Sequence, residues 1–311
     1  MRVAPPAYRL DYHPLLIEEA VLIAVSGHPE EVHFRGERDR LYEMPQGQER
    51  ECAFHDLHQN WFDRLGLSRP LREAFATWLI LMESTSRVVL VKSRSKKDEG
   101  AELYQATEKS PGIERERRTI LIRLRPEMLA RPNDLLPFLR HELLHIVDLL
   151  DPGFGYRPFS DGPLPSIADW SQRERYHLLW DITIDGRLNR MGLLEPSARV
   201  SDLVAFQRVF SVPAPELEAS FSLFFDREGH THDDLVSFSR FPERGLAGED
   251  SESIGRGRCS LCQFPFEDLP AASGEPPPRV IEIIRALYPS WRPGEPVCPH
   301  CIDLLTSQDI D

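Results

Sequence analysis

The most informative stretch of the sequence is Asn133-Asp-Leu-Leu-Pro-Phe-Leu-Arg-His-Glu-Leu-Leu-His-Ile-Val-Asp-Leu-Leu150, which is followed by Asp151-Pro-Gly153. Its apolar residues recur at helical spacing, and the Pro-Gly pair after it is a stop signal. The pattern therefore predicts a helix from Asn133 to Leu150. His141 and His145 are four residues apart and lie on one face of that helix. Both imidazoles can therefore reach one metal ion.

Glu142 directly follows the first histidine, where its carboxylate can take a proton from a metal-bound water. The residues that flank the histidines are apolar, Phe138-Leu139 before and Ile146-Val147 after, which predicts a buried helix. The alternative is a core helix whose two histidines only form hydrogen bonds with their neighbours. The spacing, the apolar flanks and a predicted strand just upstream favour the metal site.

The regions around this helix alternate between extended and helical patterns. β-Branched runs predict strands at 86–92 and 118–125, while the charged segment 93–117 between them is expected to be a loop or an irregular connection. The polar segment 30–51 is also expected to be rich in loops. Helices are expected at 11–25, 54–65, 70–83, 171–191, 201–210, 214–224 and 232–239. Together these patterns predict an α+β fold that is mostly helical, with a small sheet.

A strand followed by His141-Glu-Leu-Leu-His145 resembles the zincin metallopeptidases, over about residues 83–195. The resemblance implies a twisted sheet above the active-site helix, an edge strand that binds an extended peptide, and a helical part that completes the site. It also implies one catalytic Zn²⁺ held by His141 and His145, with Glu142 as the general base. A peptide or protein substrate is implied by this resemblance alone.

A catalytic zinc needs a third protein ligand and an open position for water. In the gluzincin branch, a second helix supplies a Glu ligand and, four residues later, an Asp that supports a ligand histidine. Asp181 and Asp185 have that spacing, although the first is Asp and not Glu. We expect Asp181 to be the ligand, with Asp185 as the alternative. Asp151 is a weaker candidate, because the metzincin pattern that would use it has glycine where this chain has Asp148.

Other side chains are expected to assist the site without binding the ion. Asp148 lies on the same helix face as the histidines and could orient an imidazole. A donor to the oxyanion of a tetrahedral transition state is expected, and the sequence does not choose among Tyr156, Tyr176, His177, His230 and His232. The His230-Thr-His232 triplet favours a cap of the following helix by Thr231 or its neighbours over a second metal site.

Four of the five cysteines form two pairs, Cys259-Ser-Leu-Cys262 and Cys298-Pro-His-Cys301. Two such pairs can place four thiolates around one tetrahedral Zn²⁺ in a closed structural site. The alternatives are disulfides or a redox pair, and disulfides fit poorly with a chain that shows no secretion signal. The segment resembles zinc-ribbon and treble-clef modules, with short helices expected at 279–287 and from Cys298. Cys52 is expected to be a small buried side chain.

The composition of the chain limits its possible partners and location. The chain has 311 residues and a formal net charge of −13, which argues against a surface devoted to nucleic acid, although 86–131 is locally basic. No apolar run approaches the roughly 18 residues of a membrane helix, and the N-terminus lacks an apolar core of the signal-peptide type. A cytoplasmic, non-membrane protein is expected. The expected regions are 1–82 (helical), 83–245 (zincin-like), 246–257 (linker) and 258–311 (four-cysteine module).

These observations favour a zinc-dependent metallopeptidase with one catalytic and one structural Zn²⁺. Two alternatives stay open at this point. One is a catalytically silent zincin scaffold with a binding or regulatory role, against which the presence of Glu142 argues. The other is a nucleic-acid-associated adaptor led by the four-cysteine module. The sequence does not indicate cleavage specificity or oligomeric state.

Overall fold

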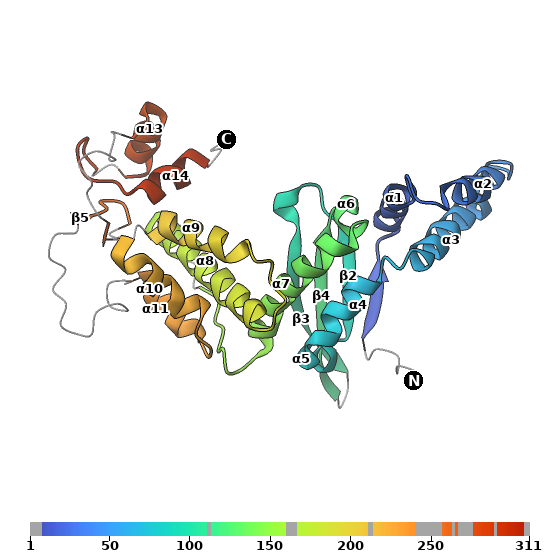
Figure 1. Cartoon of the computed structure of the whole chain (residues 1–311), viewed down its shortest axis with the longest axis horizontal. Helices are drawn as coiled ribbons and strands as arrows, with labels where there is room; N and C mark the ends of the chain where they lie inside the picture. Colours follow the sequence, from blue (N-terminus) through green and yellow to red (C-terminus); the bar gives the residue numbers. More distant parts are fainter. Residues whose placement is uncertain are drawn as a thin grey trace. The chain divides into compact units, whose positions relative to one another are not determined.

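The computed structural model describes residues 8–110, 113–159, 167–210, 214–240, 257–262, 265–266, 276–288 and 291–307 (Figure 1). The fold is α+β, with many helices and a small mixed sheet. The chain divides into two compact units, Met1–Pro152 and Gly153–Asp311. This division differs from the boundaries expected from the sequence, which fall after residues 82 and 245. Apart from Gly257, the linker expected at 246–257 lies outside the described residues.

The first unit contains a four-stranded sheet with the order β1-β2-β4-β3. Its strands are β1 (Arg9–Tyr12), β2 (Arg87–Lys92), β3 (Gly100–Ser110) and β4 (Ile113–Leu124). β1, β2 and β4 run parallel to one another, and β3 pairs antiparallel with β4. The strands predicted at 86–92 and 118–125 are confirmed.

The expectation of a loop at 93–117 is wrong, because β3 and the first residues of β4 lie within this segment. β3 forms one edge of the sheet. Charged side chains on an edge strand can reach water, so the strand does not need an alternating apolar pattern to be stable. Arg123 on β4 also forms an ion pair with Glu102 on β3, so part of the charge pattern holds the two strands together.

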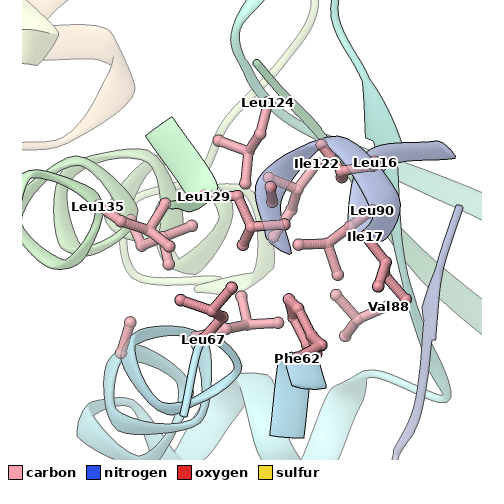
Figure 2. Close-up of a cluster of buried hydrophobic side chains, with 14 of the residues drawn as sticks. Leu16, Ile17, Phe62, Leu67, Val88, Leu90, Ile122, Leu124, Leu129 and Leu135 are labelled. Atoms are coloured by element: carbon pink, nitrogen blue, oxygen red, sulfur yellow. The ribbon is translucent and has the colours of Figure 1, made fainter. Parts of the chain in front are cut away.

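Helices α1 to α7 pack with this sheet around one core. They are α1 (Pro14–Val25), α2 (Glu31–Tyr42), α3 (Gln48–Arg64), α4 (Arg69–Thr77), α5 (Leu79–Ser84), α6 (Pro126–Leu129) and α7 (Pro132–Leu150). Figure 2 shows Leu16 and Ile17 of α1 and Phe62 of α3 facing Leu90 and Ile122 of the central strands. Because the N-terminal helices share this core, the helices that precede β2 and the sheet form one compact unit.

The expectation of a loop-rich segment at 30–51 is also wrong. It contains α2 and the beginning of α3, which pack against each other. Phe34 of α2 is buried edge-on against the ring of Trp61 on α3. The remaining residues of α2 are largely polar, so its helical periodicity rests on a single buried aromatic residue and is weak in the sequence.

The second unit contains α8 (Ile167–Arg190), α9 (Ala198–Phe210), α10 (Ala214–Phe225) and α11 (His232–Arg240), followed by β5 (Gly257–Arg258), β6 (Pro265–Phe266), α13 (Pro278–Leu287) and α14 (Pro299–Ser307). All the helices predicted for this part of the chain are confirmed. α8 packs against α9, α10 and α11. Gly186 of α8 lies directly against the carbonyl of Phe225, where a side chain would overlap it. No helix in the described parts of either unit is long and apolar enough to cross a bilayer.

Candidate metal centres

The two histidines of α7 lie one above the other, as their spacing predicts. The Nε2 atoms of His141 and His145 are 3.3 Å apart. Two nitrogen ligands about 2.05 Å from a tetrahedral zinc ion are themselves about 3.3 Å apart, so this separation fits shared coordination. Both side chains are partly buried.

Glu142 faces the start of β3. Its Oε2 accepts a hydrogen bond from the backbone N–H of Ala101, with an N···O distance of 3.1 Å. The carboxylate also lines a cavity of about 680 Å³ beside β3 and the chain that follows β2. Four basic residues, Lys92, Arg94, Lys97 and Arg123, line the same cavity. A substrate in this cavity would therefore be within reach of the Glu142 carboxylate.

The candidate third ligands lie at different places. Asp181 and Asp185 are on α8 and are partly buried, whereas Asp151 is exposed and directly follows the end of α7. His141, His145 and Asp151 belong to the first compact unit, whereas Asp181 and Asp185 belong to the second. Asp148 is buried within α7.

The four paired cysteines come together in the second unit. Cys259, Cys262, Cys298 and Cys301 have sulfur atoms that all lie within 4.8 Å of one another. The Cys259–Cys301 and Cys262–Cys298 sulfur pairs are each 3.8 Å apart. Disulfide-bonded sulfurs would be about 2.05 Å apart, so the disulfide alternative does not match this geometry. Four sulfurs about 2.3 Å from a tetrahedral zinc are about 3.8 Å from one another, so these cysteines fit a closed four-sulfur site.

The surroundings of the four-cysteine cluster also suit a structural site. Cys259, Cys298 and Cys301 are buried, and Cys262 is partly buried. The backbone N–H of Cys298 donates a hydrogen bond to the sulfur of Cys259 over 3.3 Å. Apolar residues, among them Leu261, Val280 and Trp291, surround the cluster.

The fifth cysteine, Cys52, does not belong to this cluster. It is exposed, so the expectation that it is buried is wrong. Cys52 lies on the polar part of α3 that the sequence did not predict to be helical. Its exposure therefore follows from a helix face that the sequence pattern did not reveal.

The candidate oxyanion donors lie in varied surroundings. Tyr176 and His232 are buried and hydrogen-bonded to each other, with Oη and Nδ1 2.8 Å apart. Burial lowers the pKa of His230 and His232 and raises that of Tyr156, while His177 is exposed.

The His230-Thr-His232 triplet leads into a capped helix. Thr231 and Asp234 form reciprocal hydrogen bonds with each other's backbone N–H at the start of α11. This pattern is a helix cap, as expected from the sequence.

No protein-family model matches the chain, and neither a curated protein nor a solved structure matches it. Two contacts were not predicted from the sequence: the Ala101 N–H that binds Glu142, and Arg175 of α8, which contacts Cys262. Ala101 had no sequence signal, because its role depends on where β3 begins. A charged residue inside an apolar helical pattern is a weak signal for Arg175.

Proposed function

We propose that the chain is a zinc-dependent hydrolase of the zincin type that cleaves peptide bonds. The observation that carries this proposal is the pair of imidazole nitrogens 3.3 Å apart on α7, with Glu142 next to them in the chain and exposed to a cavity. A buried structural pair of histidines would not need an adjacent carboxylate at a cavity wall. The peptide bond as the target comes from the resemblance to zincins.

In this proposal, His141, His145 and Asp181 would hold the catalytic ion. A bound Zn²⁺ supplies Lewis acidity and lowers the pKa of a water molecule to about 7. Glu142 would accept a proton from the water molecule that attacks the peptide carbonyl carbon. Glu142 passes the same proton to the departing amine nitrogen when the C–N bond breaks. The carboxylate thus ends the cycle ionised, as it began.

The position of β3 supports a peptide as the substrate. β3 is an edge strand, so one row of its backbone N–H and C=O groups is not paired within the sheet. An extended peptide can add to such an edge through backbone hydrogen bonds. The β3 residues Gly100, Ala101 and Glu102 line the same cavity as Glu142. A peptide paired with the beginning of β3 would therefore pass beside the proposed base.

For the four-cysteine cluster we propose a structural Zn²⁺ held by Cys259, Cys262, Cys298 and Cys301. Four sulfur ligands leave no open position for a substrate or water. The role of this ion is therefore to stabilise the C-terminal residues, for which the apolar cluster around the cysteines is small.

The replacement of Glu142 by Gln tests the proposed function. It keeps the size of the side chain and removes the base, so we expect cleavage of a mixed peptide library to fall by about 10²- to 10⁴-fold. Zinc content per chain should not change, because Glu142 is not a ligand. Glu127→Gln is the matched control, since Glu127 is exposed and lies outside the cavity lining. Equal cleavage by wild type and Glu142→Gln would contradict the proposal.

A further inference from the structure

A buried arginine of α8 contacts the four-cysteine cluster. Arg175 is only 2% exposed, and its Nη2 donates a hydrogen bond to the sulfur of Cys262 with an N···S distance of 3.4 Å. Cys262 is the least buried of the four cysteines. The guanidinium thus contacts the least buried of the four cysteines.

Further contacts join the cluster to the same helix. His300 lies between Cys298 and Cys301 in the chain, is buried, and has its Nε2 3.5 Å from Oε2 of Glu174 on α8. Trp170, one turn earlier on α8, packs against the apolar cluster around the cysteines. Helix α14, which carries Cys301, packs against α8 and α9. The first half of α8 therefore forms one wall of the cysteine module.

The charge of a loaded centre explains why an arginine is found there. Four thiolates around one divalent ion carry a net charge of −2, and a buried charge is costly unless an opposite charge or hydrogen-bond donors compensate it. A guanidinium is permanently protonated and tolerates burial better than an ammonium group.

We propose that Arg175 is a positioning residue of the four-cysteine metal centre and that metal loading fastens the C-terminal module to α8. The proposal rests on the metal site proposed above for the four cysteines. The ion then stabilises both the module itself and the contact between the module and α8, the helix that carries Asp181. Substitution of a residue that hydrogen-bonds to a metal ligand commonly changes metal affinity by about 10- to 100-fold.

Titration of the metal-free full-length chain with Co²⁺ tests this inference. Thiolate-to-cobalt charge transfer gives an absorption band that a histidine–carboxylate site does not produce, so the four-cysteine site is measured alone. We expect Arg175→Gln to bind Co²⁺ about 10- to 100-fold more weakly than wild type, and Arg175→Lys to lie between them. The charge-transfer band of Arg175→Gln should move to longer wavelength, because the sulfur electrons lose a stabilising positive charge.

The matched control is Arg285→Gln. Arg285 is an exposed arginine of α13 in the same module, and this variant should behave as wild type in affinity and band position. If Arg175→Gln matches Arg285→Gln in both, the proposal is overturned. A wild-type chain with no thiolate band would instead refute the four-cysteine metal site itself, and the inference with it.

Hydrogen exchange on the wild-type chain gives a second, independent readout that does not depend on whether a variant folds. Addition of one equivalent of Zn²⁺ should slow amide exchange in α8 between Trp170 and His177, as well as around the cysteines. Slower exchange around the cysteines alone, with α8 unchanged, would overturn the proposal that the metal fastens the module to this helix.

Discussion

In the proposed hydrolase site, single side chains would decide which metal chemistry is available. His141 and His145 fit one ion from one helix, and the third ligand decides whether that ion is held firmly. We predict that Asp181→Asn lowers zinc occupancy of the histidine site by about 10-fold or more, because a carboxylate ligand is lost. Zinc content after dialysis against a weak chelator measures this. Asp185→Asn is the control, four residues further on the same helix, and a loss confined to this control would make Asp185 the ligand.

The identities of the candidate site residues were predictable, since His141, Glu142, His145 and the cysteine pairs have diagnostic spacing. The groups that each of these side chains contacts were not predictable from the sequence. The Ala101 N–H reaches Glu142 only because β3 begins at Gly100, and strand boundaries within a charged segment leave little trace in the sequence. Arg175 could be recognised only once α8 was seen beside the cysteines.

At the scale of elements, the contact between α8 and α10 depends on Gly186, which has no side chain. In a helix interior Ala is usually more stable than Gly by about 0.5–1 kcal/mol. At Gly186, however, a methyl group would overlap the carbonyl oxygen of Phe225, to which Arg190 also donates a hydrogen bond. We predict that Gly186→Ala lowers the free energy of unfolding by about 1–3 kcal/mol, the usual cost of overpacking, as measured by urea denaturation.

Gly36 provides the opposite case within the same protein. It also lies in a helix, α2, and nothing surrounds the position where its Cβ would be. Gly36→Ala should therefore raise the free energy of unfolding. If both variants are stabilised, packing between α8 and α10 is looser than the structure indicates.

The prediction of elements from the sequence succeeded where an element has one apolar and one polar face. β2, α7 and α8 are of this kind. It failed for α2 and β3, which bury few apolar side chains and hold their places through contacts with α3 and β4. Their periodicity is therefore too weak to be seen in the sequence alone.

On the scale of the whole molecule, the two candidate centres share no ligand, so loss of the ligands of one should leave the other able to hold an ion. We predict two zinc ions per wild-type chain, measured by mass spectrometry of the purified protein under non-denaturing conditions. His141→Ala should retain one, held by the cysteines. Cys259→Ser together with Cys298→Ser should also retain one, held by the histidine site. A wild-type chain with a single zinc that persists in His141→Ala would rule out the hydrolase proposal.

The short strand β1 has a consequence for how the protein is made. Arg9–Tyr12 pairs in parallel with β2, whose residues lie more than seventy positions later. The sheet therefore cannot be completed until the intervening helices have been synthesised, and contacts this distant along the chain slow folding. Until β1 is in place, the apolar run Val88–Val91 of β2 has an open edge, which is a template for pairing with another chain. By pairing with β2, this short strand covers that edge in the folded protein.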